Sequence, residues 1–193
     1  MKNICIFTGS SAGSNPQHIS TARSLGGAIA ARGMGLVYGG ATIGLMGAVA
    51  DACLDAGGRV VGVMPKALAD LEIAHKALSE QHIVSSMHER KALMADMSDG
   101  FLALPGGLGT LDELFEIWTW GQLGEHQKPV AILNAGGFFD PLLAYLDHVV
   151  EEGFIKPAHR EMLIVHQTAD EVLDAMTSYD PPGVAKIISE FDL

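Results

Sequence analysis

The sequence predicts an α/β fold, a single doubly wound domain whose mainly parallel sheet carries helices on both faces. Seven short apolar segments alternate with longer segments in which apolar residues recur at helical spacing. The apolar segments lack a regular polar and apolar alternation, which is typical of strands buried on both faces of a parallel sheet. Helical crossovers of right-handed sense would connect such strands.

The elements follow one another in a regular order along the chain. The strand candidates are residues 4–8, 35–38, 60–64, 81–84, 101–104, 130–133 and 162–165. The helix candidates are residues 16–32, 45–56, 88–97, 111–123, 141–152 and 169–177, with a last helix from about residue 184 in a weakly characterised tail that begins at about residue 181. Because no linker, repeat or change in composition divides the chain, we expect one domain over residues 1–193.

Composition and charge exclude several classes of function. A hydrophobic fraction of 48% without low-complexity segments is typical of a folded globular chain. The formal net charge of −11 argues against a general nucleic-acid or anionic-membrane surface, since both require basic patches. It leaves room for one small phosphate compound in a locally positive pocket.

Cysteines, histidines and the N-terminus indicate a cytoplasmic protein without a metal site. Cys5 and Cys53 have no C-x-x-C or zinc-ligand spacing, so we expect two reduced, buried thiols. The eight histidines form no H-E-x-x-H motif. The first apolar run is too short for a signal peptide, and no 18-residue apolar span follows.

The most informative segment joins the fifth strand candidate to the fourth helix candidate and reads LPGGLGTLDE over residues 104–113. Glycines let the backbone approach an anion, and the first N–H groups of a helix point toward it, so the segment predicts a phosphate cradle. It has neither the P-loop lysine nor the G-x-G-x-x-G dinucleotide pattern. An alternative is a capping box with Thr110 as N-cap and Glu113 at the third position, which could coexist with a catalytic role.

Two further glycine-rich segments follow the first and second strand candidates, at residues 9–13 and 38–47. Ligands of doubly wound sheets bind outside the carboxyl ends of the strands. One such segment is more often a tight turn, but three at one edge predict a nucleotide-like ligand. Gly9, Ser10, Gly39 and Gly40 are therefore secondary candidates for binding.

The segment MHERK, residues 87–91, opens another helix at the same edge. Arg90 offers a planar fork that suits a phosphate or a ribosyl diol, and Met87 is a secondary candidate beside it. The alternative is a solvated charge run, which would explain Lys91. Glu72 lies in an irregular segment and, taken alone, reads as a surface acid.

Together, YGG at residues 38–40, MHERK at 87–91 and PGGLGTLDE at 105–113 resemble the LOG ("lonely guy") family. Its members are cytokinin riboside 5′-monophosphate phosphoribohydrolases, long mislabelled as lysine decarboxylases. The likeness runs in order from the first strand to about residue 152, and its P-G-G-x-G-T-x-x-E signature is specific. The tail beyond residue 159 carries little of it.

The resemblance implies a Rossmann-like fold, a homodimer, no cofactor, and cleavage of an adenine nucleotide monophosphate to free base and ribose 5-phosphate. Trp118 and Trp120 are expected to pack on a helix face or to form a dimer contact. By motif, the paired catalytic residues are Arg90 and Glu113. The expected substrate contacts are Glu72, Arg90, Lys91, Gly106, Gly107, Leu108, Gly109, Thr110, Leu111, Asp112, Glu113 and Thr119. Asp112 departs from the family pattern, because plant members often have a second glutamate there, and this puts the contact to base or ribose in doubt.

The implied chemistry is coherent. Departure of adenine leaves positive charge on C1′ and the ring oxygen, and a fixed carboxylate can stabilise it and activate water. Glu113 is assigned this task, and Arg90 would hold phosphate or ribose and lower the pKa of Glu113. The alternative is a non-catalytic nucleotide or cofactor carrier, similar to the molybdenum cofactor carriers. A carrier needs the glycine loops but not the carboxylate.

Overall fold

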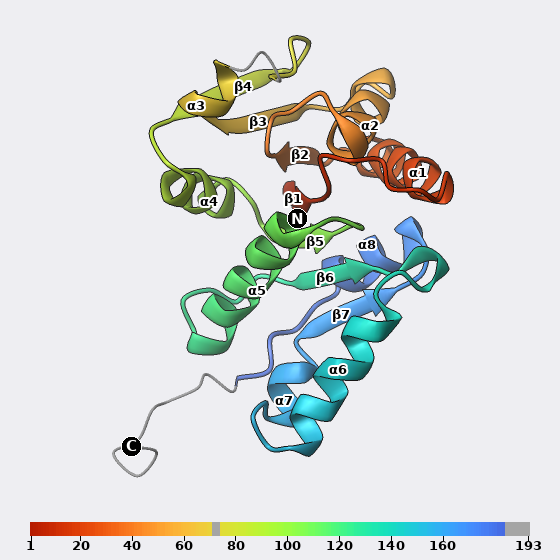
Figure 1. Ribbon diagram of the computed structural model, residues 1–193, viewed down its shortest axis with the longest axis vertical. Helices are drawn as coiled ribbons and strands as arrows, with labels where there is room; N and C mark the ends of the chain where they lie inside the picture. The colour runs from red at the N-terminus through yellow and green to blue at the C-terminus, as the bar shows by residue number, and fades with distance from the viewer. Residues whose placement is uncertain (71–73, 184–193) are drawn as a thin grey trace.

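A single seven-stranded sheet, wholly parallel, forms the centre of the computed structural model, which describes residues 1–70 and 74–183 (Figure 1). The strand order is β4-β3-β2-β1-β5-β6-β7. The strands are β1 (Asn3–Phe7), β2 (Gly35–Tyr38), β3 (Val60–Pro65), β4 (Glu80–Val84), β5 (Gly100–Ala103), β6 (Val130–Leu133) and β7 (Leu163–His166). The α/β, parallel-sheet prediction is confirmed.

The helices also follow the predicted order. They are α1 (Gln17–Ala31), α2 (Gly44–Asp55), α3 (Lys66–Ala69), α4 (Met87–Asp96), α5 (Leu108–Leu123), α6 (Asp140–Glu151), α7 (Pro157–Arg160) and α8 (Ala169–Thr177), with a short 3₁₀ turn at Ala135–Gly137. The single-turn helices α3 and α7 were not predicted, because four residues carry no helical periodicity. The helix expected from residue 184 lies outside the described residues. Within the described ranges, no helix is long and apolar enough to cross a membrane.

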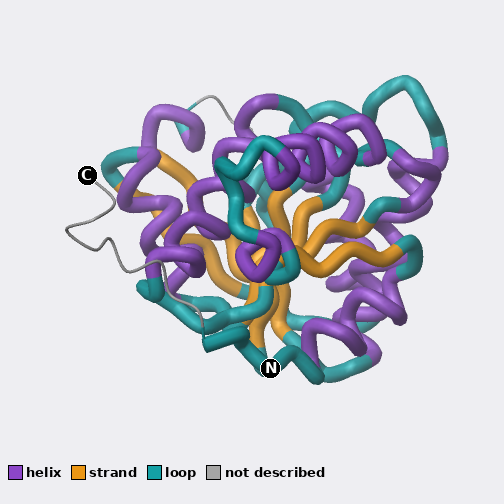
Figure 2. The backbone as a smooth tube through the Cα atoms, turned by 90° about the horizontal axis from the view of Figure 1, so that it is seen from below, coloured by secondary structure: helices purple, strands orange, loops and turns teal. Residues whose placement is uncertain are grey.

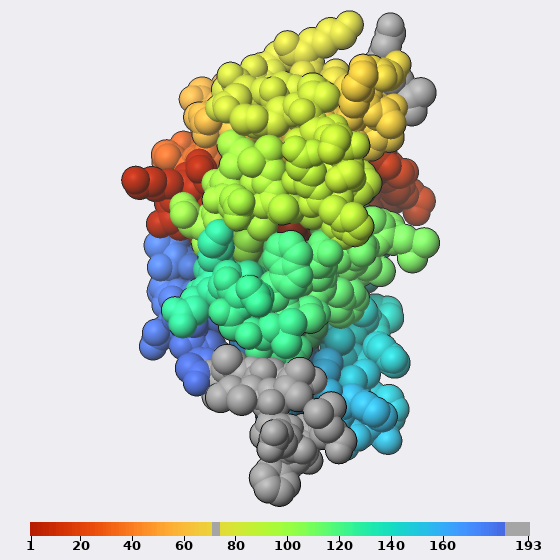
Figure 3. All heavy atoms as spheres, turned by 90° about the vertical axis from the view of Figure 1, so that its left-hand side faces the viewer, coloured from red at the N-terminus to blue at the C-terminus, as the bar shows by residue number. Residues whose placement is uncertain are grey.

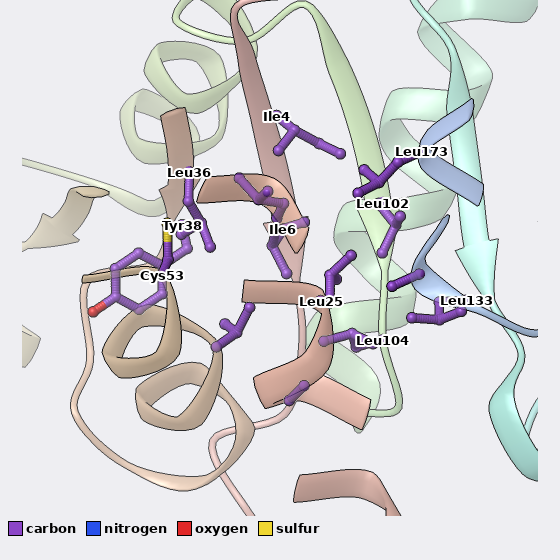
Figure 4. Close-up of a cluster of buried hydrophobic side chains, with 14 of the residues drawn as sticks. Ile4, Ile6, Leu25, Leu36, Tyr38, Cys53, Leu102, Leu104, Leu133 and Leu173 are labelled. Carbon is purple, nitrogen blue, oxygen red and sulfur yellow. The ribbon is translucent and has the colours of Figure 1, made fainter. Parts of the chain in front are cut away.

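Alternate residues of each strand build two cores, one on each face of the sheet. Ile4 and Ile6 of β1 belong to the core under α1, α2 and α8, which also contains Leu25 of α1 (Figure 4). Cys5 and Phe7 of the same strand belong to the opposite core, under α4, α5 and α6. Figure 2 shows the strands enclosed by helices on both sides. Burial on both faces explains why the strands read as unbroken apolar runs.

The strand order places a topological switch between β1 and β5. The chain proceeds from β1 outward through β2 and β3 to β4, and then returns to β5 on the other side of β1. The loops that leave β1 and β5 therefore diverge to opposite faces. This divergence opens a crevice at the carboxyl ends of the two strands, where doubly wound folds bind ligands.

Candidate active site

A cavity of about 400 Å³ lies at this switch point, and segments that follow β1, β2, β3 and β5 line it together with α4. Its lining comprises Thr8, Gly9, Ser10, Gly39, Ala41, Ile43, Met46, Met64, Leu68, Met87, Arg90, Gly107, Leu108, Gly109, Thr110, Asp112 and Glu113. The three predicted glycine-rich segments thus meet in one place. The size of the cavity is in the range of small-molecule sites.

Backbone and hydroxyl hydrogen bonds join the glycine loops to one another. The N–H of Gly9 and the hydroxyl of Thr8 both donate to the carbonyl of Pro105, each at 3.1 Å. The carbonyl of Gly9 in turn accepts from the N–H of Leu45 at the start of α2, at 3.1 Å. The loops after β1, β2 and β5 therefore form one connected rim rather than three independent turns.

The N-terminus of α5 forms one wall of the cavity, and its capping differs from the prediction. The N-cap is Gly107, which has no side chain, so the capping box with Thr110 and Glu113 is wrong. The helix begins at Leu108, and Thr110 sits inside its first turn, buried against Gly106. A helix leaves its first N–H groups without intrahelical acceptors. With no capping side chain over them, these groups are available to an anion.

Close approach explains why glycine occupies position 106. A Cβ there would collide with the hydroxyl oxygen of Thr110 and would come within 2.8 Å of the N of Gly9. At Gly107 and Gly109 a Cβ would meet nothing within 4 Å. The first glycine is therefore needed for packing between loops, whereas the other two keep the space beside the helix N-terminus open.

Helix α4 delivers Arg90 to the cavity, and a capping box fixes where that helix begins. The hydroxyl of Ser86 accepts from the N–H of Glu89 at 3.1 Å, and the carboxylate of Glu89 accepts from the N–H and hydroxyl of Ser85. Glu89 of the MHERK segment is thus a capping residue. Gly39 provides the space for the arginine, since a Cβ at this position would collide with Nη2 of Arg90.

Arg90 and Glu113 form a buried ion pair in the lining of the cavity. Arg90 Nη2 lies 3.1 Å from Glu113 Oε1, and the two side chains are only 10% and 8% exposed. Arg90 Nη1 contacts the sulfur of Met87 at 3.8 Å, and Arg90 Nε is buried with no acceptor among the described residues. The guanidinium therefore retains donors that a ligand in the cavity can use.

Burial dominates the electrostatics of the Glu113 carboxyl. It raises the pKa of Glu113, while the positive charge of Arg90 acts in the opposite direction and only partly offsets it. Our expectation that Arg90 would leave the pKa of Glu113 lowered is therefore wrong, because desolvation of a carboxylate inside the protein outweighs one ion pair. A carboxyl with a raised pKa beside a fixed cation is typical of catalytic sites.

Of the other residues expected to contact the substrate, some line the cavity and some lie outside its lining. Lys91 lies outside the lining and pairs with Asp112 and Glu116 of α5. Gly40, Gly106, Leu111 and Thr119 are also outside the lining, and Thr119 is exposed on α5. Glu72 falls outside the described residues.

An apolar side of the cavity was missed by the sequence reasoning. It is formed by Ile43 and Met46 after β2 and by Met64 and Leu68 around the end of β3. Only their positions immediately after strand ends could have indicated them, because single apolar residues in loops resemble ordinary core residues. Their presence gives the cavity an apolar part of its lining in addition to the polar groups of Arg90 and Glu113.

Trp118 and the two cysteines are buried in the interior of the protein. Trp118 is buried, and its indole N–H donates to the carbonyl of His159 at 3.0 Å, which confirms packing on a helix face. Cys5 and Cys53 are free and buried, as expected. Among residues 1–70 and 74–183, no group of three or more potential metal ligands occurs.

Solved structures share the fold at low sequence identity. The molybdenum cofactor binding protein of Rippkaea orientalis aligns with a TM-score of 0.70 and 22% identity, over 92% of this chain and 97% of that protein. The molybdenum cofactor carrier protein of Chlamydomonas reinhardtii aligns with a TM-score of 0.68 and 20% identity, over 91% and 96%. These likenesses establish the Rossmann-like α/β fold.

Sequence relatives are much closer. Residues 46–176 match the protein family described as "Possible lysine decarboxylase". A probable cytokinin riboside 5′-monophosphate phosphoribohydrolase of Oryza sativa subsp. japonica is 48% identical over 93% of this chain and 85% of its own length. The cytokinin riboside 5′-monophosphate phosphoribohydrolase of Rhodococcoides fascians is 46% identical over 92% and 90%. The chain therefore belongs to the LOG family of cytokinin riboside 5′-monophosphate phosphoribohydrolases.

Proposed function

We propose that this protein is an N-glycosidase that hydrolyses adenine-type nucleoside 5′-monophosphates to free base and ribose 5-phosphate. The observation that carries the proposal is the buried Arg90–Glu113 pair, which lies in the same cavity as the open N-terminus of α5. Phosphate recognition and a carboxylate are the two parts that this reaction requires. The relatives' names point to the same chemistry.

The reaction breaks the bond between C1′ and the base nitrogen, and the electron pair of that bond leaves with the base. Positive charge develops on C1′ and the ring oxygen, and the ionised Glu113 is placed to stabilise it. Water adds to C1′, and its proton is transferred to Glu113 as general base or to the departing base. Arg90 holds the carboxylate in place and presents its remaining N–H donors to the ribose or phosphate.

Two parts of the cavity lining suit the phosphate and the base of the nucleotide. The 5′-phosphate is assigned to the N-terminus of α5, where Gly107 and Gly109 leave space beside free backbone N–H groups. The base is assigned to the apolar side formed by Ile43, Met46 and Met64. Such a surface accepts either plain adenine or adenine with an aliphatic N6 substituent, so both AMP and N6-modified AMP are proposed substrates.

A carrier function on the same fold is the second candidate, supported by the molybdenum cofactor proteins among the structural neighbours. At about 20% identity those likenesses concern the fold alone. A carrier has no need for a buried carboxylate opposite an arginine, since an unused buried ion pair contributes little to stability. The Arg90–Glu113 pair therefore favours the enzyme.

The proposal includes a cytoplasmic homodimer. Its support is the family resemblance together with large apolar side chains on the surface, including Leu123, Tyr145 and Phe154. Light scattering of the purified chain should give twice the mass of 20.4 kDa at micromolar concentration. A particle of one chain mass would overturn this part of the proposal.

The experiment that tests the function is a panel of nucleoside monophosphates incubated with the protein and a chelator, with products separated by chromatography. We expect free base from AMP, N6-isopentenyl-AMP or both, and their relative kcat/KM identifies the preferred substrate. Absence of free base from both, combined with measurable nucleotide binding, would favour the carrier.

A further inference from the structure

Lys91 follows Arg90 on α4, but its side chain contacts α5 outside the cavity. Its Nζ lies 3.2 Å from Oδ2 of Asp112 and 2.9 Å from Oε2 of Glu116, both on α5. The side chain is only 10% exposed and does not line the cavity. Figure 3 shows the face on which α4 and α5 lie side by side. The ammonium group is thus used within the protein, between two helices.

Three ion pairs, made by two neighbouring residues of α4, therefore join the same pair of helices. Arg90 and Lys91 are neighbours on α4, and their partners Asp112, Glu113 and Glu116 span little more than one turn of α5. Both helices also pack on one buried core, so the pairs of Lys91 add to packing in fixing where Arg90 lies relative to Glu113. A displacement of about 1 Å at a reacting group can cost about 10²-fold in rate.

Lys91 also balances the charge around Glu113. Asp112 and Glu116, on the same helix, raise the pKa of Glu113 in addition to burial, whereas Arg90 and Lys91 lower it from α4. From β1, the Cys5 thiol faces the same carboxylate, and burial first and Glu113 second raise the pKa of that thiol, so it carries no charge at neutral pH. Burial lowers the pKa of Lys91, but the contacts of its ammonium group with the carboxylates of Glu116 and Asp112 together outweigh burial and raise the pKa, so Lys91 stays positive.

We propose that Lys91 is a positioning residue, which clamps α4 to α5 through Asp112 and Glu116 and so holds Arg90 opposite Glu113, and that it does not contact the nucleotide. This inference rests on the proposed function for its effect on turnover. It replaces the direct substrate contact that the MHERK motif suggested for Lys91. Removing the ammonium should therefore act through Glu113 and not through nucleotide affinity.

The test compares Lys91→Met, Lys91→Arg, Glu116→Gln and the double variant Lys91→Met/Glu116→Gln. Lys91→Met leaves two acids uncompensated, so Glu113 should ionise at higher pH than in the wild type. On the acid limb of the wild type, we expect kcat/KM of Lys91→Met to fall about tenfold; at pH 8, kcat should fall while KM changes by less than about twofold. Lys91→Arg should retain most activity. Adding Glu116→Gln to Lys91→Met should return the acid limb toward the wild-type position without restoring kcat at pH 8, because the double variant still lacks the contact between the helices.

Glu116→Gln alone provides an independent prediction in the opposite direction. It removes one of the two acids and leaves Lys91 paired with Asp112, so the acid limb should move to lower pH. Its measurement keeps the proposal testable if Lys91→Met does not fold, which circular dichroism would reveal. A raised KM in Lys91→Met with an unmoved acid limb and no rescue by Glu116→Gln would overturn the proposal and assign Lys91 to substrate binding.

Carboxylate titration by NMR separates this inference from the proposed function. With carbon-13 in the glutamate side chains, the Glu113 signal, assigned through Glu113→Gln, should titrate at higher pH in Lys91→Met than in the wild type. An unchanged titration would contradict the inference even if the protein is a hydrolase. A changed titration in a protein that releases no base would support the action of Lys91 on Glu113 while overturning the proposed function.

Discussion

Arg90 Nη2 lies 3.1 Å from Glu113 Oε1 inside the protein, on helices whose N-termini both border one cavity. Taking both charges out of water costs free energy that their attraction only partly returns, so a buried ion pair is weak support for stability. Its position beside an open helix N-terminus is consistent with the proposed role of the pair in chemistry on an anionic ligand.

The first prediction concerns Glu113→Gln. The amide keeps the size of the side chain but removes the negative charge, so turnover of AMP should fall by about 10²-fold or more. The fold should be retained by circular dichroism, because α5 is not capped by this residue. The control is Glu125→Gln, the same change at an exposed position after α5, which should behave as the wild type. Near-normal turnover in Glu113→Gln would show that the residue is structural only.

The second prediction concerns pH. Burial raises the pKa of Glu113, with the Arg90 charge opposing it, so the acid limb of kcat/KM should lie above the pKa of an ordinary glutamate. Activity requires the ionised form and should rise with pH through this limb. An acid limb at or below the ordinary glutamate value would contradict the assignment of Glu113.

The same shift makes a third, thermodynamic prediction. A carboxyl with a raised pKa in the folded state contributes stability below its unfolded-state pKa, and this contribution is lost as pH rises through the folded-state pKa. Glu113→Gln resembles the protonated acid and should gain Tm relative to the wild type as pH increases over this range. Thermal unfolding of both proteins across pH measures the difference, and a gap independent of pH would refute it.

A matched pair of glycine substitutions provides the fourth prediction. Gly106→Ala should lower both Tm and activity, because its Cβ collides with Thr110 and approaches the backbone of Gly9. Gly109→Ala has free space around its Cβ and lies in a helix, so Tm should not fall. It should nevertheless weaken AMP affinity by narrowing the phosphate site. Unchanged affinity in Gly109→Ala, measured by calorimetry, would locate the phosphate elsewhere.

The fifth prediction is dependence on a single 5′-phosphate. Charge-assisted hydrogen bonds contribute about 1.5–3 kcal/mol each, so loss of the phosphate should lower kcat/KM by at least ~10²-fold for adenosine relative to AMP. ADP should also be a poorer substrate, because the glycine loop lacks the lysine and metal ligands that longer phosphate chains use. The three compounds are compared under identical conditions. Equal activity on adenosine and AMP would contradict the phosphate cradle.

Much of the fold could be predicted because its strands are buried on both faces. The apolar runs at residues 35–38 and 130–133 coincide with β2 and β6, since a parallel sheet under two helical layers requires unbroken apolar segments. The start of α5 was placed three residues too late, because Leu108 and Gly109 lack helical periodicity. Leu108 is 87% exposed, so the first turn of α5 has no apolar side facing the core that the sequence could reveal.

The sequence motifs predicted several of the residues that line the candidate site, but the contacts that depend on packing between helices could not be predicted. The motifs identified Arg90 and Glu113, and the structure brings both into one cavity. Lys91 belongs to the same motif as Arg90, but the side chains of consecutive helical residues point in different directions. The spacing of residues in the sequence could not show that Lys91 pairs with Asp112 and Glu116 on α5. The sign of the pKa shift at Glu113 depends on burial, which the sequence also does not contain.

The central claim is that the bond between C1′ and the base is broken by addition of water to C1′. The most direct measurement is incubation of the wild-type protein with AMP or N6-isopentenyl-AMP in water enriched in oxygen-18, followed by mass spectrometry of the products. We predict equal amounts of unlabelled free base and of ribose 5-phosphate that carries one oxygen-18 at C1′. Labelled inorganic phosphate with intact nucleoside, or no reaction with either nucleotide, would contradict the claim.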